Sequence, residues 1–251
     1  MSKRITCISD THTKQRGLLT LADRDKFTGD FSINDLDLPG GDILIHAGDI
    51  MNSGYVAREI GEFLEWFDAI PGYDKKVLIA GNHDRLFELV PATVKLLLDK
   101  YPRIIYLEDS GFALYDLDED TSIKFWGSPW QPEFYNWAFN LPRGGEELKA
   151  KWAAIPEDTH ILITHGPAQG YRDTSGPPHN EPNLGCELLT ERIKEIKPSI
   201  HVCGHIHGGA GYATDGDTHF INASVLDERY QLVNKPLTFD WDSKTNKITF
   251  L

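Results

Sequence analysis

The sequence has few cysteines and no long apolar run. Its three cysteines, Cys7, Cys186 and Cys203, are too few and odd in number for a disulfide scaffold. We expect buried thiols in a reducing compartment, the cytoplasm. The apolar run near the N-terminus is too short for a signal peptide, and no stretch approaches the roughly 20 apolar residues of a membrane-spanning helix. We therefore expect no membrane partner.

Positive charge is also scarce. Lys and Arg total 25 against 38 Asp and Glu, which gives a formal net charge of −13. Nonspecific binding to long nucleic acid depends mainly on neutralising phosphates with Lys and Arg, so such a partner is not expected. An acidic protein can still bind a small phosphate ester where a local cation offsets the repulsion. The composition is that of a globular protein without repeats or linkers, and we expect a single domain over residues 1–251.

Five short apolar segments run directly into His, Asp or Asn. In the clearest case, residues 43–45 follow Pro39-Gly40-Gly41 and end in His46-Ala47-Gly48-Asp49. Such a run is typical of a strand buried on both faces. The other four segments are residues 4–9, 76–80, 159–164 and 199–203. Because α/β sheets place ligands at the carboxyl ends of strands, we expect these side chains to converge at one edge: Asp10, His12, Asp49, Asn82, His83, His165, His205 and His207.

Hydrophobic spacing predicts the remaining elements. Helices are expected over residues 56–67, 86–100 and 184–196, the second being one helix or a pair with Pro91 in a first turn. Two segments without periodicity, residues 13–41 and 166–183, are expected to form rims of a pocket. Further strands are predicted at residues 104–107, 111–115, 122–126, 218–223, 237–241 and 247–250, with hairpins joining the second to the third and the last two.

Residues 126–152 are rich in aromatic side chains and contain three prolines. Two interpretations stay open: these aromatics pack in the core, or they form a pocket wall over a flat ligand. Arg143 is a candidate contact to a phosphate or a nucleobase, with a plain surface arginine as the alternative. The remaining histidines are expected to be packed or hydrogen-bonded, with His179 alone placed to reach a substrate: His46, His160, His179, His201 and His219.

The residue types at the strand ends favour a metal centre. Imidazole suits Zn, Fe, Mn, Ni and Cu, whereas carboxylate and carbonyl oxygens favour harder ions. A mixture of both without cysteine fits Mn²⁺, Fe or Zn²⁺. The candidate ligands are too many for one tetrahedral zinc, but about right for two metals that share a carboxylate. Paired ions ~3.5–4 Å apart can polarise a phosphoryl group, make hydroxide from water and stabilise the departing oxygen.

The order of these residues resembles a known family. Five motifs match, in order, those of the calcineurin-like metallophosphoesterases: Asp10-x-His12, Gly48-Asp49, Gly81-Asn82-His83-Asp84, His165 and Gly204-His205-Ile206-His207. Segments at residues 127–132, 140–144 and 221–224 also resemble one branch of this family, the metallophosphoesterase-domain-containing, class III cyclic nucleotide phosphodiesterase-like proteins. The resemblance implies a four-layer α/β/β/α sandwich of two mixed β-sheets flanked by helices.

The resemblance also implies a role for each residue. Asp10, His12 and His207 would hold one metal, Asn82, His165 and His205 the other, and Asp49 would bridge both. His83, beside Asn82, would face the substrate and either stabilise the phosphoryl charge or protonate the leaving oxygen, with Asp84 orienting it. Some relatives in the narrower branch lack the histidine that matches His205. Because this chain keeps it, we expect two metals, Mn²⁺ or Fe, with Zn²⁺ as the alternative.

These implications define a leading hypothesis and two alternatives. The leading hypothesis is a phosphodiesterase for small or cyclic nucleotides, in which a metal-activated hydroxide attacks phosphorus in line without a covalent enzyme intermediate. The acidic balance and an aromatic segment able to stack a base favour it. One alternative is a phosphomonoesterase or protein phosphatase with the same metals, because rim loops decide the substrate. The other is a nucleotide-binding scaffold with little turnover.

Overall fold

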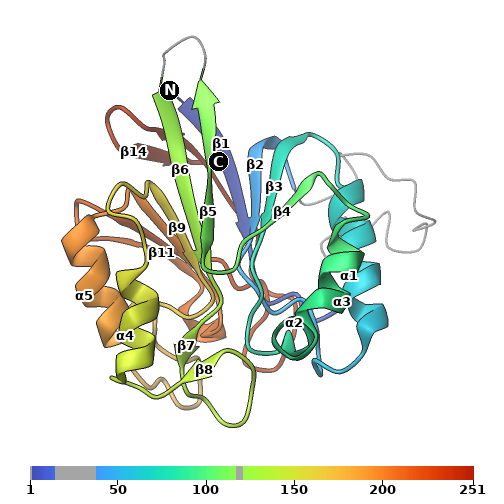
Figure 1. Ribbon diagram of the computed structural model, residues 1–251. Coiled ribbons are helices and arrows are strands. Elements are labelled where there is room, and N and C mark those ends of the chain that lie inside the picture. Colours follow the sequence, from blue (N-terminus) through green and yellow to red (C-terminus); the bar gives the residue numbers. More distant parts are fainter. Residues whose placement is uncertain (1, 15–37, 117–120) are drawn as a thin grey trace.

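The computed structural model describes residues 2–14, 38–116 and 121–251. In this part of the chain, two six-stranded mixed sheets pack face to face, with helices on both outer sides (Figure 1). This confirms the predicted four-layer arrangement. The first sheet has the order β14 (Lys247–Phe250), β13 (Leu237–Asp242), β1 (Ser2–Ile8), β2 (Gly41–His46), β3 (Tyr73–Leu78) and β4 (Ile104–Tyr106).

The second sheet repeats this plan. Four neighbouring strands are parallel in each sheet, β1 to β4 in the first. Antiparallel pairing adds two strands at one edge of the first sheet and one strand at each edge of the second. The second sheet has the order β11 (Gly211–Thr214), β12 (His219–Asn222), β10 (Ile200–Cys203), β9 (Ile161–Thr164), β6 (Thr121–Ser128) and β5 (Ser110–Asp116). Since β12, β10, β9 and β6 are parallel, their carboxyl ends share one edge of the sheet.

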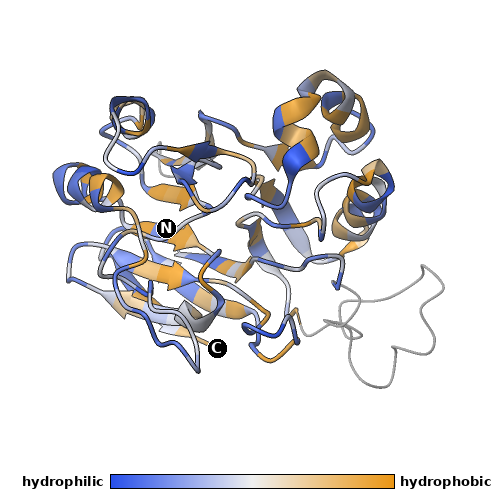
Figure 2. Cartoon of the chain, turned by 90° about the horizontal axis from the view of Figure 1, so that it is seen from below, coloured by the Kyte–Doolittle hydropathy of each residue, from blue (hydrophilic) through white to orange (hydrophobic). Residues whose placement is uncertain are grey.

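Alternating apolar side chains build the layers. In β2, Ile43 and Ile45 pack between the sheets, whereas Leu44 packs against the helices α1 (Ala57–Ala69) and α3 (Pro91–Leu98). In β9, Ile161 and Ile163 point between the sheets, and Leu162 points to α4 (Glu146–Ala153) and α5 (Glu187–Ile196). Figure 2 shows apolar segments in the strands of both sheets and in the helices around them. Strands buried on both faces thus explain the continuous apolar runs of the sequence.

Most predicted elements are present, with shifted ends. Residues 86–100 form a pair, α2 (Arg85–Leu89) and α3, and Pro91 lies in the first turn of α3 as expected. The third strand begins at Tyr73 and ends at Leu78, so the predicted range 76–80 was wrong at both ends. No pattern in the sequence indicated α4, β11 or the short pair β7 (Gln131–Pro132) and β8 (Asn140–Leu141). Most of the predicted rim at 13–41, and residues 117–120 between β5 and β6, lie outside the described residues.

The three cysteines are buried, as expected. Cys7, Cys186 and Cys203 are buried and free, and burial raises the pKa of each thiol. Such buried neutral thiols act as small apolar side chains. Over the residues described, every helix is too short or too polar to cross a lipid bilayer.

Candidate metal centre

The carboxyl ends of five parallel strands bring the predicted residues together. Asn82 follows β3 of the first sheet, whereas His165 and His205 follow β9 and β10 of the second. Oδ1 of Asn82 lies 2.9 Å from Nε2 of His165 and 2.8 Å from Nδ1 of His205. The two sheets therefore meet at a single site.

Three groups of side chains have ligand atoms within 4.8 Å of one another. Asp49 belongs to two of them: its Oδ2 lies 3.3 Å from Nε2 of His165 and 3.6 Å from Nε2 of His12. In the group that contains Asp10, Oδ1 of Asp10 lies 3.5 Å from Nε2 of His207. A carboxylate shared between neighbouring groups has the position that a bridging ligand requires. The groups are Asp10/His12/His207, His12/Asp49/His83 and Asp49/His165/His205.

Main-chain carbonyls orient three of the imidazoles. Nδ1 of His12 lies 2.9 Å from the carbonyl of Met51, and Nδ1 of His165 lies 2.9 Å from that of Ala47. His207 makes the same contact, at 2.8 Å, with the carbonyl of Asp227. Because a carbonyl only accepts, each Nδ1 carries the hydrogen and each Nε2 faces the site. This is the usual support of a metal-binding histidine.

His12 shows that the site suits a cation. Its Nε2 is buried and has no hydrogen-bond partner. Burial lowers the pKa of His12 to about 4, although Asp49 and Asp10 act in the opposite direction, so the ring is neutral at pH 7. A buried acceptor without a partner costs ~1–3 kcal/mol. A metal ion among the oxygen and nitrogen donors around it removes this cost.

The buried carboxylates give the site its negative charge. Burial acts to raise the pKa of Asp10 and Asp49, but the neighbouring histidines outweigh it and hold both well below the usual range. Burial also acts to lower the pKa of His165 and His207, yet the same carboxylates raise both to about 9. His205 differs, because burial and the nearby His165 lower its pKa to about 3. The two buried carboxylates therefore require compensating positive charge, which protonated histidines or metal ions can supply.

Four of the predicted ligands have left-handed backbone conformations. The φ angles are 55° for Asp10, 41° for His12, 59° for Asp49 and 67° for His205. Sparsely populated backbone conformations cost ~1–3 kcal/mol each and persist where the surroundings impose them. Here the N–H of Asp10 donates to the carbonyl of Gly48 at 3.0 Å, and that of His12 to the carbonyl of Asp49 at 3.1 Å. Such strain is typical of functional sites.

His83 belongs to the His12/Asp49/His83 group and is held at both its backbone and its ring. Its N–H donates to Oδ1 of Asp49 at 2.7 Å. Its Nδ1 lies 2.7 Å from the carbonyl of Asn52, so Nδ1 carries a hydrogen and Nε2 is the ring nitrogen that this contact leaves unengaged.

The Asp84 carboxylate binds main-chain N–H groups and not, as predicted, the His83 ring. Its carboxylate accepts hydrogen bonds from the N–H groups of Asp49 at 2.9 Å, Met51 at 2.9 Å and Gly81 at 2.7 Å. The expected orientation of the His83 ring by Asp84 is therefore wrong, since the Asn52 carbonyl does this. Burial and the charge of Asp49 raise the pKa of Asp84 to about 7. Asp84 ties the Asp49 loop to the Asn82 loop.

A pocket of about 410 Å³ opens over these groups. Ser175, His179 and Glu181 line it, which confirms that the 166–183 segment forms a rim. Phe134 and Tyr135 line it as well, whereas Phe139 and Trp152 are buried. Both interpretations of the aromatic segment thus hold, for different residues.

Arg143 is not among the residues that line this pocket. Its Nη1 donates to the carbonyl of Gly185 at 2.9 Å and to Glu187 at 2.6 Å, and its Nη2 donates to the carbonyl of Leu184 at 2.9 Å. The guanidinium therefore braces the start of α5.

The other histidines are packed or hydrogen-bonded, as expected. Nε2 of His46 lies 3.1 Å from Oγ1 of Thr11. His160 accepts from the N–H of Lys124 at 3.1 Å. The remaining two contacts join Nε2 of His201 to Oγ1 of Thr164 at 2.7 Å and Nδ1 of His219 to the hydroxyl of Tyr212 at 2.9 Å.

Two residues of the site were not predicted. Oγ of Ser224 donates to Oδ2 of Asp10 at 2.7 Å. The ring of Tyr230 packs against His12 at 4.8 Å and His207 at 5.3 Å between centroids, and it lines the pocket. Ser224 lies in a segment already noted for the family resemblance. Tyr230 stands in a segment without periodicity, and the sequence carries no signal for it.

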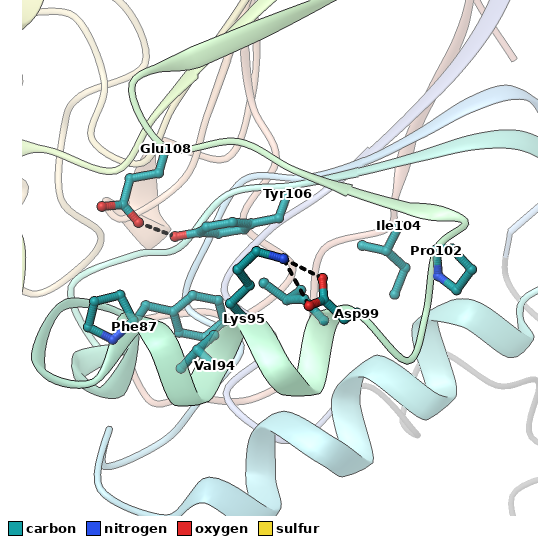
Figure 3. A pocket seen from close by; sticks show the side chains of 10 residues that line it. Phe87, Val94, Lys95, Asp99, Pro102, Ile104, Tyr106 and Glu108 are labelled. Atoms are coloured by element: carbon teal, nitrogen blue, oxygen red, sulfur yellow. Dashed lines mark hydrogen bonds and ion pairs between the residues drawn. The ribbon is translucent and has the colours of Figure 1, made fainter.

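A second pocket of about 480 Å³ lies beside α3 (Figure 3). Phe87, Val94 and Ile104 form its apolar wall. The charges around it are paired, as Lys95 donates to Asp99 at 2.7 Å and the Tyr106 hydroxyl to Glu108 at 2.7 Å. None of the predicted site residues lines this pocket, so we assign the chemistry to the pocket over the histidines.

Comparison with known proteins agrees with this geometry. The sequence profile of the calcineurin-like phosphoesterases matches residues 3–209. The chain belongs to this family, and is thus a metal-dependent phosphoester hydrolase. It is 37% identical to human metallophosphoesterase domain-containing protein 1, over 97% of this chain and 72% of that protein.

Two further comparisons extend the likeness. The chain is 34% identical to the UPF0046 protein T07D4.2 of Caenorhabditis elegans, over 94% of this chain and 59% of that protein. The crystal structure of TT1561 of Thermus thermophilus superposes with a TM-score of 0.60 at 15% identity, covering 100% of this chain and 99% of that one. The latter likeness concerns the fold alone.

Proposed function

We propose that this protein hydrolyses small phosphodiesters, cyclic nucleotides among them, with two metal ions. The observation that carries the proposal is the position of Asp49 between two ligand groups, with Oδ2 within 3.6 Å of both His12 and His165. A carboxylate in this position is the shared ligand of a two-metal site.

The family resemblance assigns three further ligands to each ion besides Asp49. Asp10, His12 and His207 would hold one ion. Asn82, His165 and His205 would hold the other, which the convergence of both imidazoles on Oδ1 of Asn82 supports. The mixture of oxygen and imidazole donors suits Mn²⁺ or Fe, with Zn²⁺ as the alternative.

The residues of the chain supply the rest of the chemistry. When bound, two divalent cations supply Lewis-acid polarisation of a phosphoryl group and easier ionisation of water. His83 lines the pocket, and its Nδ1–H is engaged by the Asn52 carbonyl. Its Nε2 can therefore bear the proton that a departing alkoxide or phenolate oxygen requires.

The shape and charge of the site support a small substrate. A volume of about 410 Å³ is that of a small-molecule site. Phe134 and Tyr135, 48% and 77% exposed, line the pocket and can stack a nucleobase. The net charge of −13 disfavours long nucleic acid. The three free thiols support a reducing compartment such as the cytoplasm.

A substrate panel tests the proposal. Protein loaded with Mn²⁺ would be offered bis-p-nitrophenyl phosphate, p-nitrophenyl phosphate, and the 2′,3′- and 3′,5′-cyclic forms of AMP and GMP. We expect turnover of the diesters to exceed that of the monoester. Turnover of monoesters alone would replace the diesterase by a phosphomonoesterase, and tight AMP or GMP binding without turnover would indicate a nucleotide-binding scaffold.

A further inference from the structure

An indole ring covers one face of the His83 imidazole. The rings of Trp137 and His83 are stacked, with centroids 4.0 Å apart and an interplanar angle of 22°. His12 meets His83 in an edge contact at 4.5 Å. Three groups therefore restrain the His83 imidazole: the Trp137 ring, the His12 ring and the Asn52 carbonyl at Nδ1.

The segment that carries Trp137 is tied on both sides of the indole, to Asn82 and to Arg85 at the start of α2. On one side, the N–H of Ala138 donates to the carbonyl of Asn82 at 3.1 Å. On the other, the guanidinium of Arg85 donates to the carbonyl of Asn136. The same guanidinium lies over the Trp137 ring at 5.7 Å. The indole is therefore positioned by the loop that it supports.

From this geometry we infer that Trp137 is a positioning residue for His83. The inference rests on the proposed role of His83 in catalysis. A hydrogen bond at Nδ1 fixes one ring atom but permits rotation of the ring plane about that contact. Stacking fixes the plane, and aromatic pairs contribute ~0.5–1.5 kcal/mol beyond the area that they bury. Nε2 is then held in one direction, toward the pocket.

Trp137 acts through His83 rather than on the substrate. Phe134 and Tyr135 from the same segment line the pocket, whereas Trp137 is not among the lining residues. The indole instead contacts the His83 imidazole and the Arg85 guanidinium. Its loss should therefore change the rate of the chemical step more than the affinity for substrate.

Kinetics of Trp137→Leu and Trp137→Phe test the inference with bis-p-nitrophenyl phosphate and Mn²⁺. We expect Trp137→Leu to lower kcat about 10-fold to 100-fold, since small misplacements of a catalytic group have effects of this size. KM should change by less than about 3-fold, and Trp137→Phe, which keeps a stacking ring, should retain most of the rate. The matched control is Tyr115→Leu, an aromatic residue 78% exposed on β5, which should leave both constants unchanged.

A double variant separates this inference from the proposed function. If Trp137 acts through His83, adding Trp137→Leu to His83→Ala should cause no further loss of kcat. A full additional loss, or a rise in KM with unchanged kcat, would overturn the positioning role. If His83→Ala alone kept full turnover, the catalytic role of His83 would fail, and the positioning role with it.

The stack also has a signature that does not depend on activity. In metal-free protein, the indole ring current should shift the His83 ring-proton resonances upfield, with the signals assigned by their loss in His83→Ala. Trp137→Leu should return them downfield, and circular dichroism should show both variants folded. Unchanged resonances together with unchanged kcat would refute the inference.

Discussion

Oδ2 of Asp49 lies 3.3 Å from Nε2 of His165, although the two residues follow strands of different sheets. The contact exists because β2 and β9 are both parallel strands that end at the same edge of the sandwich. A buried carboxylate requires a positive partner. In this site the candidate partners are protonated histidines or the metal ions that we propose.

The bridging position of Asp49 leads to the first prediction. Asp49→Ala should abolish turnover and release both metals, because it removes a ligand from each. Metal content per chain, measured by elemental analysis after dialysis, checks this. Asp99→Asn, an exposed carboxylate paired with Lys95, is the control and should keep both metals. Near-normal turnover with both metals retained in Asp49→Ala would show that Asp49 does not bridge.

A second prediction separates the acid from the ligands. His83→Ala should keep both metals but lose ~10²–10⁴-fold in kcat, as expected for a general acid. The comparison is made at saturating Mn²⁺, with metal content determined on the same samples. Loss of a metal from this variant would instead make His83 a ligand.

Gly204 gives a prediction about the backbone. A Cβ at this position would collide with Oγ of Ser9 and Oδ2 of Asp10. Gly204→Ala should displace Asp10, weaken metal binding and cost ~1–3 kcal/mol of unfolding free energy by overpacking. Urea denaturation and metal titration would measure both effects.

Gly61 in α1 provides the matched control for Gly204. An added Cβ there meets no atom within 4 Å. Gly61→Ala should therefore leave metal binding intact and stabilise the helix by ~0.5–1 kcal/mol. If Gly204→Ala and Gly61→Ala had the same effect on metal binding and on the free energy of unfolding, the close approach at Gly204 would not matter for metal binding.

His201 gives a prediction for the pH dependence of stability. Burial lowers its pKa from 6.5 to about 3, so the folded state keeps the ring neutral where the unfolded state binds a proton. The contribution of the neutral His201 ring to the free energy of unfolding is fully present above pH 6.5. It is lost as the pH falls toward 3, by up to ~1.4 kcal/mol per pH unit.

The variant His201→Gln removes this titration while keeping an N–H that can donate to Thr164. Between pH 6.5 and 5, the free energy of unfolding of the wild type should therefore fall by up to ~2 kcal/mol more than that of His201→Gln. Denaturant titrations at several pH values measure the difference. Parallel pH profiles for both proteins would show that His201 does not titrate on unfolding.

The metal-centre residues could be predicted because they depend on strand ends. Once residues 43–45 and 159–164 are read as buried parallel strands, the residues after them must meet at one edge. Asp49 and His165 are examples, and their contact required no knowledge of the loops. The family resemblance added which group of ligands each residue joins.

The supporting residues could not be predicted, because they depend on how long segments return to the site. Tyr230 and Trp137 pack on the site histidines from loops without periodicity. Asp84 follows His83 in sequence, yet its carboxylate turns to the backbone of Asp49 and Met51. Whether Asp84 contacts the His83 ring or this backbone depends on the path of the folded loops. Helix α4 was not predicted because it is only weakly amphipathic: Leu148 and Trp152 are its buried residues.

The most direct test of the two-metal account counts metals and turnover together. Chelator-stripped wild type and His205→Ala would each be loaded with Mn²⁺ and assayed with bis-p-nitrophenyl phosphate, with metal content determined per chain. We predict two metals and Mn²⁺-dependent hydrolysis for the wild type, and one metal with little hydrolysis for His205→Ala. A wild type that binds no metal, or that hydrolyses the diester equally well without one, would contradict the account.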